Sequence, residues 1–576
     1  MTKVKNVSST PDSSIWRLIW QSHRVAFAKV IALNLLNALV GVLTIAYINQ
    51  DLLSGKSLTW QSLAIFLGLI IALLATTFIS QFALTKLGHQ FVLELRQKIV
   101  KQILDSDITQ TQAIGSARLL ASLSTDIQAI TTAFVRLPEL IQGVILCVGA
   151  GLYLGFLSLP LLLIVAVWIT ITIVVSGKLV NHVYAYLEKI RLTNDQLYQD
   201  YQAVIDGQPE LKLHRPRAKR LYQSFAEHTE AFRNDIIKAD TFHLSAVNWS
   251  NIMMFAGIGI VLVLSQVLSL ASLPVALTFG VTLLFLKVPL LSAVGAYPTL
   301  QSAQVALNKI QSLGLAHYQA EFLVDLDKFN DWQQLHFDQI AYAYPKGKNG
   351  GNNSDKMATQ FALSPLKFTL QRGEVVFLIG ANGSGKTTFA KLLTGIYPPT
   401  HGDIKVTLAN GDIVAVRESL LADYRQLFSA IFSDFYLFDT LMNDKGENPD
   451  DSLVSEWLAK LEISHKTHIL NHQIQDTKLS QGQKKRLAML LAVADNKPIM
   501  LLDEWAADQD PSFRRYFYHD LIPMLKAMGK TLFVISHDDS YFAAADRLLL
   551  MKHGILTELT DDARQQATHD AISAIS

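Results

Sequence analysis

Six long apolar stretches in the first 300 residues restrict what this chain can fold into. They lie at about 25–48, 61–83, 135–157, 160–180, 244–270 and 274–297. A helix needs about 20 predominantly apolar residues to cross the hydrocarbon core of a bilayer. We therefore predict a membrane domain over residues 1–310 with six transmembrane helices.

The connections between these stretches predict their orientation. Two connections, 84–133 and 181–243, are long and polar, and their Lys and Arg residues greatly outnumber Lys56, the only basic residue in the short connections. Because basic residues favour the cytoplasmic side, the long connections and both termini are expected there. The helical periodicity of FVLELRQKIVKQIL predicts that the spanning helices continue beyond the bilayer, and Asp206-Gly207 is a candidate turn between two of them.

Composition excludes several other classes of protein. Charged residues make up only 17% of the chain, and the polar sequence is concentrated after about Asn308. Lys plus Arg (50) nearly equals Asp plus Glu (49), so no broad basic field is available and no nucleic-acid partner is expected. The single cysteine, Cys147, cannot form an intramolecular disulfide or a cysteine zinc cluster and is expected to be a packing residue.

A few polar residues lie inside the predicted spans. Lys287 falls near the middle of the sixth span, where a charge costs about 2.5–3.5 kcal/mol on insertion scales. It either reaches a polar neighbour on the fifth span, such as Ser245 or Asn248, or lines a cavity for cargo, and both interpretations remain open. For Asn34 and Asn37 in the first span, hydrogen bonds between helices are favoured over cavity lining.

The sequence changes character after residue 335, where short β runs and polar turns predict an α/β domain over 333–576, joined by a linker at 311–332. A loop at Lys346–Asp355 is expected to be disordered. The strand FTLQRGEVVFLIG then enters GANGSGKTT, which matches the phosphate-binding loop pattern. In such a loop the backbone N–H groups surround the phosphates, the lysine contacts the phosphate oxygens and the threonine hydroxyl binds Mg²⁺. The expected ATP-binding residues of this loop are Gly380, Asn382, Gly383, Ser384, Gly385, Lys386, Thr387 and Thr388.

Two later strands end in residues suited to ATP hydrolysis. The strand IMLLD is followed by a second carboxylate, so Asp503 is predicted to position Mg²⁺ through water and Glu504 to polarise the attacking water. His537 follows the strand TLFVIS, where it is expected to contact the γ-phosphate. Any one of these residues alone could be a polar residue that only forms hydrogen bonds at the end of a strand. Their order and spacing after a phosphate loop favour a catalytic role.

The segment LSQGQ (479–483), taken with the phosphate loop, LLDE and His537, resembles the signature of the ATP-binding-cassette superfamily, and the resemblance covers nearly all of 333–556. It implies that Ser480, Gly482 and Gln483 close over ATP held by another cassette. Since this chain has one loop and one signature, a head-to-tail homodimer is expected. The resemblance also implies that Tyr344 stacks on adenine and that Asp510 is the D-loop aspartate.

The chain departs from the superfamily pattern at the Q-loop. Aligning AIFSDFYLF places Ser433 where a glutamine is usual, and Gln426 lies seven residues too early. The sequence therefore does not assign the glutamine that contacts Mg²⁺. The stretch before LSQGQ also lacks the Glu-Gly pattern of drug and lipid exporters.

A six-span half ahead of its own cassette resembles the exporter architecture: a six-helix α transmembrane domain fused to an α/β P-loop ATPase. FSAIFSDFYLF, DGQPELKLH, LLDEWAADQDP and SHDDSYF resemble the bacterial subfamily that exports cyclic or lasso peptides and peptide siderophore precursors. The resemblance implies ATP-driven export of a peptide-like cargo across the bacterial inner membrane by a homodimer embedded in lipid. A lipid or multidrug exporter, and a siderophore importer on the exporter fold, remain alternatives. The six spans argue against a soluble cassette ATPase, and the exact cargo, stoichiometry and host are not indicated.

Overall fold

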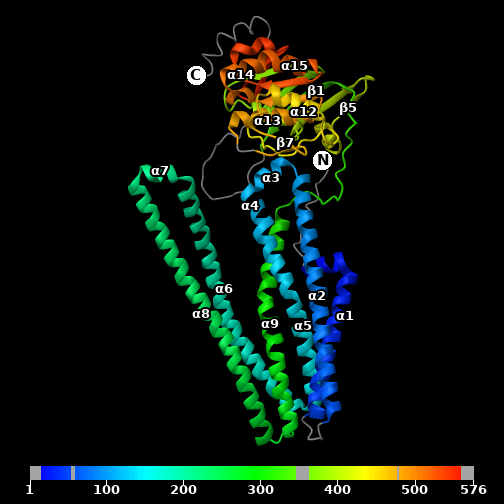
Figure 1. Cartoon of the computed structure of the whole chain (residues 1–576), viewed down its shortest axis with the longest axis vertical. Helices are drawn as coiled ribbons and strands as arrows, with labels where there is room; N and C mark the ends of the chain where they lie inside the picture. Colours follow the sequence, from blue (N-terminus) through cyan, green and yellow to red (C-terminus); the bar gives the residue numbers. More distant parts are fainter. Residues whose placement is uncertain (1–14, 53–58, 345–361, 477–478, 560–576) are drawn as a thin grey trace, which may run out of the picture. The chain divides into compact units, whose positions relative to one another are not determined.

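The structure is a computed structural model that describes residues 15–52, 59–344, 362–476 and 479–559 (Figure 1). The chain divides into two units, one of residues 1–100 and 117–314 and the other of residues 101–116 and 315–576. The loop predicted at Lys346–Asp355 lies outside the described residues.

The described part of the first unit consists of helices joined by short connections. It contains α1 (Ile15–Tyr47), most of α2 (Trp60–Asp105), α4 (Ser116–Ala121), α5 (Ile127–Leu157), α6 (Leu159–Asp206), α7 (Gln208–Leu213), α8 (Arg215–Val267) and α9 (Leu273–Ser312), with π-helical turns at Ile48–Leu52 and Ser122–Asp126. By length and composition, six of its helical segments can cross a membrane: Arg24–Leu52, Trp60–Asp105, Arg118–Leu157, Leu159–Asp206, Arg215–Val267 and Leu273–Leu290. The number of helices able to span a membrane, six among the described residues, agrees with the sequence prediction.

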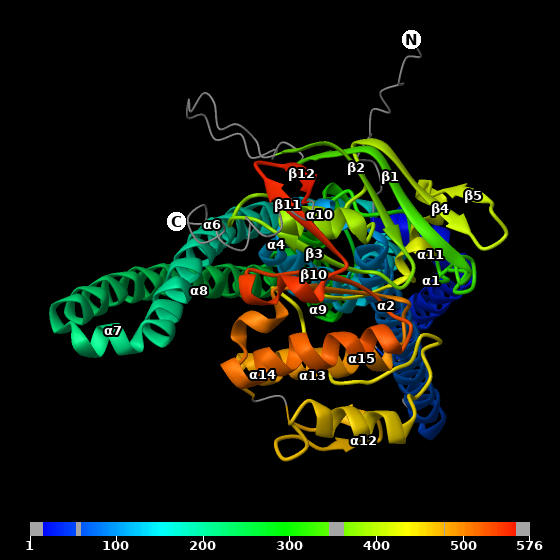
Figure 2. The same cartoon turned by 90° about the horizontal axis from the view of Figure 1, so that it is seen from above.

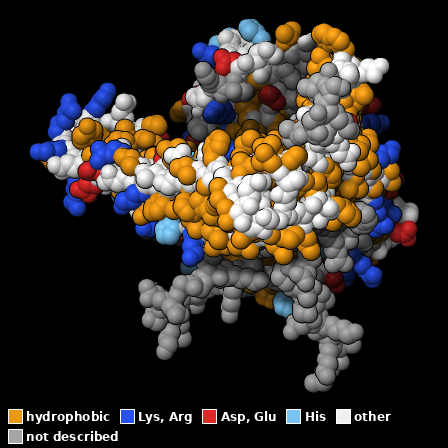
Figure 3. Space-filling view, turned by 90° about the horizontal axis from the view of Figure 1, so that it is seen from below, with side chains coloured by type: hydrophobic (Ala, Val, Ile, Leu, Met, Phe, Trp, Pro, Cys, Tyr) orange, Lys and Arg blue, Asp and Glu red, His pale blue; other side chains and the backbone are white. Residues whose placement is uncertain are grey.

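Several of these helices are much longer than a bilayer requires. α8 has 53 residues and α6 has 48, so each extends roughly 70–80 Å against a hydrocarbon core of about 30 Å. α6 ends at Asp206, as expected, and α6 and α8 run side by side as a hairpin with α7 at its tip (Figure 1). Figure 3 shows hydrophobic side chains over much of the helical unit and Lys and Arg gathered at the tip of this hairpin.

Polar groups inside the helical unit mostly join helices. Asn37 on α1 accepts hydrogen bonds from the hydroxyls of Thr76 and Thr77 on α2, at 3.0 and 2.9 Å, which confirms the predicted contact between helices. Asn34 is buried as well, but its amide donates to the Val30 carbonyl of its own helix at 2.9 Å, so it packs without the predicted hydrogen bond between helices. Cys147 packs beside the apolar cluster of Ala38, Leu146, Ala150 and Leu286, as expected of a packing residue.

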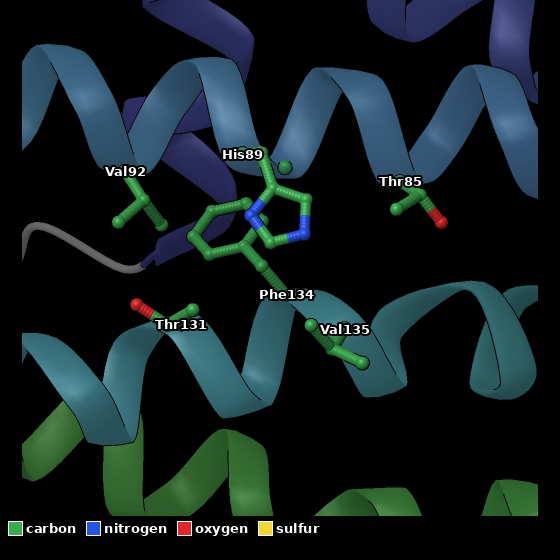
Figure 4. A pocket seen from close by; sticks show the side chains of 7 residues that line it. Thr85, His89, Val92, Thr131, Phe134 and Val135 are labelled. Carbon is green, nitrogen blue, oxygen red and sulfur yellow. The ribbon is translucent and has the colours of Figure 1, made fainter.

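α2 and α5 approach each other closely at Gly88. A Cβ at this position would lie 3.1 Å from the Cβ of Phe134, so a larger residue would push the helices apart. Figure 4 shows the ring of His89 beside Phe134, with the other labelled side chains around a shallow recess. The rings of Phe91 and Phe134 also pack together, with centroids 4.7 Å apart. A glycine and aromatic side chains thus set the spacing of these two helices.

The second unit contains two larger sheets. The first, β2-β1-β4-β5, is antiparallel and the second has the order β12-β11-β3-β10-β9-β6. The strands are β1 (Trp332–Ala343), β2 (Ala362–Gln371), β3 (Val375–Ile379), β4 (His401–Leu408), β5 (Ile413–Ala415), β6 (Phe428–Ile431), β9 (Ile499–Asp503), β10 (Thr531–Ile535), β11 (Arg547–Lys552) and β12 (Ile555–Glu558), and β7 (Ile469–Leu470) with β8 (Gln473–Ile474) forms a small ribbon. In the second sheet all strand pairs are parallel except β11 with β12.

The second sheet is buried on both faces, as parallel sheets usually are. In β3, Val375 and Phe377 enter one hydrophobic cluster while Val376 and Leu378 enter another. Figure 2 shows α13, α14 and α15 on one side of β3 and β10 and α10 on the other. The described helices of this unit are α3 (Ile108–Ile114), α10 (Lys386–Leu393), α11 (Leu421–Arg425), α12 (Asp451–Lys460), α13 (Gln481–Ala494), α14 (Pro511–Tyr516) and α15 (Ile522–Ala527), with 3₁₀ turns at Glu418–Leu420, Trp505–Asp508 and Asp539–Ala544 and a π turn at Phe517–Leu521.

The order of the parallel strands determines where polar residues meet. β10 pairs with β3 on one side and with β9 on the other. Because the carboxyl ends of parallel strands lie at the same edge, the segments that follow β3, β9 and β10 converge there. These are the segments that carry the predicted ATP site.

The short helix α3 belongs to the second unit although it lies between membrane helices in the sequence. The side-chain amide of Gln102 donates to the Ala316 carbonyl at 2.8 Å, and the hydroxyl of Ser106 accepts from the Ala316 amide at 2.9 Å. The hydroxyl of Tyr397 donates to the side-chain oxygen of Gln112 on α3, at 3.0 Å. Hydrogen bonds thus fasten α3 and its neighbours to the sheet-containing part of the chain.

Candidate nucleotide site

The loop between β3 and α10 has the shape of a phosphate cradle. Gly380 has φ +149°, and a Cβ there would lie only 2.2 Å from the Met551 carbonyl oxygen, so no other residue fits. The Nζ of Lys386 donates to the carbonyl oxygens of Gly380 and Ala381 at 2.8 and 3.1 Å, which holds the ammonium over its own loop. Burial lowers the pKa of Lys386, while the nearby Glu504 and Asp503 act in the opposite direction.

Thr387 and Asp503 form a pair of oxygen donors beside this loop. The Thr387 hydroxyl donates to Oδ2 of Asp503 at 3.0 Å, whereas Oδ1 of Asp503 is buried and accepts no hydrogen bond from the described residues. A buried carboxylate oxygen without a partner is costly unless a cation completes it. Oxygen ligands suit Mg²⁺, which typically takes one or two protein groups and fills its remaining positions with phosphates and water. The two residues therefore fit the expected Mg²⁺ site.

Replacing the buried carboxylate should stabilise the protein while disabling its site. Burial raises the pKa of Asp503, so its protonated form is favoured in the folded state and the carboxylate form costs stability at neutral pH. We expect Asp503→Asn to raise the unfolding midpoint of nucleotide-free, Mg²⁺-free protein at pH 7.5, by an amount equivalent to about 1–3 kcal/mol. This advantage should shrink as the pH falls toward the pKa of Asp503, because the wild-type carboxyl then becomes neutral.

The matched control for this prediction is Asp434→Asn, since the side chain of Asp434 is 73% exposed. It should leave the midpoint unchanged at every pH. Thermal unfolding at pH 7.5 and pH 5 provides the measurement, and an unchanged or lower midpoint for Asp503→Asn at pH 7.5 contradicts the prediction.

Glu504 and His537 meet at the ends of β9 and β10. Oε1 of Glu504 lies 2.9 Å from Nε2 of His537, and each side chain is about one-third exposed, at 33% and 32%. Behind His537, the Tyr518 hydroxyl lies 2.6 Å from the Ser536 hydroxyl and donates to Asp538 at 2.9 Å. A carboxylate and an imidazole thus face the same opening, with a supported hydrogen-bond network behind them.

Tyr344 lies beside the phosphate loop, as its predicted role requires. Its hydroxyl is 3.1 Å from the hydroxyl of Thr388 on α10. Its ring meets those of Tyr342 and Tyr397 edge to face, with centroids 5.2 and 6.0 Å apart. Burial raises the pKa of Tyr397 to about 12, so the Tyr397 hydroxyl is uncharged at physiological pH. Asn382 and Gly383 are exposed at the mouth of the loop, whereas Ser384 is buried.

The signature segment begins α13. Ser480 is the N-cap: its hydroxyl accepts from the backbone amide of Gln483 at 3.3 Å, and the Gln483 side chain accepts from the Ser480 amide at 3.1 Å. Ser480 itself is exposed, and a Cβ on Gly482 would lie 2.6 Å from the Asp508 carbonyl oxygen. The segment is therefore preformed, with an exposed tip and a closely packed base.

Asp510 caps the next helix, α14. It accepts hydrogen bonds from the Ser512 hydroxyl and from the Phe513 amide, and it lies 2.9 Å from a guanidinium nitrogen of Arg486. Its pKa is lowered, first by the Ser512 hydroxyl, then by the Phe513 amide and by Arg486. In this structure the predicted D-loop aspartate is thus bound within its own chain.

The structure separates the two candidates for the Q-loop position. Gln426 precedes β6, where its amide donates to the Ala422 carbonyl at 3.2 Å and its oxygen lies 3.4 Å from Nζ of Lys497. Ser433 follows β6, and its backbone N–H is close enough to Asp503 to oppose the rise in the pKa of that carboxyl. Ser433, and not Gln426, therefore lies beside Asp503.

Several residues that support the site were not predictable from local sequence patterns. Lys485 donates to the Glu504 carbonyl and Gln509 to the Gly482 carbonyl, whereas Gln112 accepts from Tyr397, whose ring packs against that of Tyr344. No spacing rule marks them, because their partners lie on other elements. A lysine at a helix position that faces the core, as Lys485 does, is the only available signal.

Two family comparisons cover most of the chain. Residues 27–288 match the family described as "ABC transporter transmembrane region". Residues 363–507 match the family described as "ABC transporter". The two matches fall in order on the helical part and on the part with the phosphate loop.

Two individual relatives are similar over nearly the full length, and a third over about half of this chain. The chain is 29% identical to the "ATP-binding protein SyrD" of Pseudomonas syringae pv. syringae, over 96% of this chain and 98% of the relative. It is 24% identical to the "ATP-dependent lipid A-core flippase 1" of Colwellia psychrerythraea, over 96% and 95%. It is 27% identical to the "Transport/processing ATP-binding protein ComA" of Streptococcus pneumoniae, over 52% of this chain and 40% of that protein.

Proposed function

The chain belongs to the ABC transporter family, with an exporter-type membrane domain fused to an ATPase that drives transport, and on this premise we propose that it exports a peptide or peptide siderophore as a homodimer. The full-length similarity to SyrD is the observation that carries the proposal, since it exceeds the similarity to the lipid A-core flippase over an equal span. The rare DEWAADQD segment after β9 points in the same direction.

We assign the chemistry of ATP hydrolysis to the residues that converge at the ends of β3, β9 and β10. Thr387 and Asp503 would hold Mg²⁺, which neutralises charge on the phosphates and orients them. Lys386 and the backbone of its loop bind phosphate oxygens, and Tyr344 packs against the adenine. Glu504 accepts a hydrogen bond from the attacking water and orients it. His537 holds the Glu504 carboxylate and faces the γ-phosphate.

The proposed homodimer follows from the exposed signature. Among the described residues, the hydroxyl of Ser480 bonds only to its own helix, and Ser480 is exposed. A second copy arranged head to tail would place its phosphate loop against this tip, so that each ATP is held by two chains. The membrane helices would lie in lipid of the bacterial inner membrane, with the ATPase part and both termini in the cytoplasm, since the basic residues around α7 favour that side.

A lipid cargo is the second candidate, because lipid A-core flippases are also similar over nearly the whole chain. ATP hydrolysis in reconstituted vesicles separates the two. A panel of cyclic peptides, peptide siderophores, lipid A-core and drugs would be added to vesicles of constant composition. Stimulation and uptake confined to peptide-like compounds supports the proposal, while stimulation by lipid A-core alone contradicts it.

Lys287 on α9 is the proposed cargo contact in the membrane domain. Its side chain is half-buried, and its ammonium lies 5.4 Å from the ring centroid of Phe255 on α8, a cation–π distance. The hydroxyl of Ser245, one of the partners considered for Lys287, instead donates to the Thr241 carbonyl at 2.7 Å. An ammonium group at an aromatic face suits the carboxylates and carbonyls of a peptide.

We expect Lys287→Met to keep folding and basal ATP hydrolysis while lowering stimulation by an active peptide at least about tenfold, since a charge-assisted hydrogen bond contributes about 1.5–3 kcal/mol. Lys287→Arg, which keeps the charge, is the matched control and should retain most of the stimulation. Stability and stimulation are measured on the same purified sample. A stable Met variant with full stimulation and export removes Lys287 from the cargo path, as does a loss that only tracks the amount of folded protein.

A further inference from the structure

Lys485 is a buried lysine on α13 that does not face the phosphate loop. Only 6% of its side chain is exposed, and a buried ammonium is costly unless it is paired and hydrogen-bonded. Its Nζ lies 2.7 Å from Oδ2 of Asp508 and donates to the carbonyl oxygen of Glu504 at 2.6 Å. The charge is therefore directed at the segment that carries the proposed base.

The backbone of Glu504 needs such support. It has φ 52° and ψ 37°, the left-handed region that residues other than glycine seldom adopt. Its amide donates to the Ile535 carbonyl at 3.0 Å, and its carbonyl accepts from Lys485 and, at 3.3 Å, from the Ala507 amide. With its peptide groups held on both sides, the Glu504 side chain is directed to His537 at 2.9 Å.

Additional bonds join α13 to the segment after Glu504. The indole N–H of Trp505 donates to the Lys485 carbonyl at 2.7 Å. The Gln509 amide donates to the Gly482 carbonyl at 3.0 Å, and its oxygen accepts from Arg486 at 2.9 Å. The helix that begins at Ser480 and the segment 504–510 are thus connected at several points and would move together.

We propose that Lys485 is a positioning residue for Glu504: with Asp508 it holds the left-handed backbone of the base, and it links the placement of the base to the helix that carries the signature. The inference rests on the proposed role of Glu504. When the signature meets a partner's nucleotide, a shift of α13 would reach the base of its own site through this lysine. Nucleotide binding does not depend on the contact, because Lys485 bonds to no residue of the phosphate loop among the described hydrogen bonds and ion pairs.

The test compares Lys485→Met with wild type, with Glu504→Gln, and with Lys484→Met as the matched control on the same helix. Methionine keeps the length of the stem but removes the ammonium. We expect kcat for ATP hydrolysis to fall about 10- to 100-fold, the loss that a small misplacement of a reacting group can cause. The KM for ATP, binding of a fluorescent ATP analogue and the unfolding midpoint should stay close to wild type, and Lys484→Met should have no effect.

The outcomes separate this inference from the proposed function. If Glu504→Gln hydrolyses ATP normally, the role of Glu504 fails and the inference fails with it. If Glu504→Gln is slow but Lys485→Met has a normal kcat, or loses kcat only in proportion to folded protein, or has a raised KM with normal kcat, Lys485 is not a positioning residue.

A second variant covers the case in which Lys485→Met does not fold. Asp508 is half-exposed, so Asp508→Asn should fold, and it weakens the hold on the ammonium without removing it. We expect a several-fold lower kcat at unchanged KM and unfolding midpoint. A full kcat in Asp508→Asn, together with an unfolded Lys485→Met, overturns the inference.

Discussion

Glu504→Gln should bind ATP with near-normal affinity and hydrolyse it roughly 10²–10⁴-fold more slowly, the contribution typical of a positioned general base. The amide keeps the size of the side chain and a hydrogen-bond acceptor for the His537 ring, 2.9 Å away in the structure, but it cannot accept the proton of the attacking water. Because binding persists while turnover stops, the variant should accumulate as a dimer with ATP held between its two ATPase parts.

Steady-state hydrolysis, binding of a fluorescent ATP analogue and the population of ATP-bound dimer provide the measurements. The matched control is Glu462→Gln, an exposed carboxylate beside Arg486. It should hydrolyse ATP as the wild type does. ATP hydrolysis by Glu504→Gln near the wild-type rate contradicts the assignment of Glu504 as the general base.

The second large effect concerns Lys386, whose ammonium lies over the phosphate loop. Lys386→Ala should lose about 10²–10³-fold in turnover, because one preorganised positive group no longer stabilises the charge that moves between phosphate oxygens. Unchanged nucleotide affinity and turnover would count against this role.

Mixing two inactive chains tests the head-to-tail arrangement. Ser480→Asp is the better signature variant, since aspartate still caps α13 while placing a negative charge toward the partner's phosphates. A heterodimer of Lys386→Ala with Ser480→Asp has one site with both residues intact and one with both changed. Measurable hydrolysis should therefore return, up to about half of the wild-type rate if the two sites work independently.

The control for this experiment is each variant mixed with itself, which should remain inactive. Preparations that contain verified heterodimers and yet stay inactive mean either that the two sites are strictly coupled or that the arrangement is wrong. A cross-link between position 480 and the partner's phosphate loop then distinguishes these possibilities.

The fold and the nucleotide-binding loop were predictable because both depend on local patterns. Apolar length alone indicated six spans, and the ends at Leu157 and Asp206 followed from Ser158 and Gly207. The glycines, lysine and threonine of the phosphate loop lie within eight consecutive residues, so their spacing reports their geometry directly.

The contacts between distant elements were not predictable. Asn34 and Asn37 look alike in the sequence, yet only Asn37 has the two threonines of α2 within reach. Ser433 lies near Asp503 because β6 pairs with β9, a register that no local pattern encodes. The bond from Lys485 to the Glu504 carbonyl likewise joins residues on a helix and a strand end that meet only after the sheet has formed.

The attachment of α3 to the ATPase part restricts where the ATPase parts of two related transporters can be exchanged. Residues 101–116 pack with residues 315–576 although they are inserted between membrane helices, and Tyr397 and Ala316 receive or supply the hydrogen bonds. A chimera that swaps motors between two such transporters at a single junction near 314 would leave Gln112 opposite a foreign surface. The segment that must be exchanged as a whole is therefore discontinuous in sequence. A chimera that transfers the ATPase part must also transfer residues 101–116, or rebuild their contacts with residues 315–576.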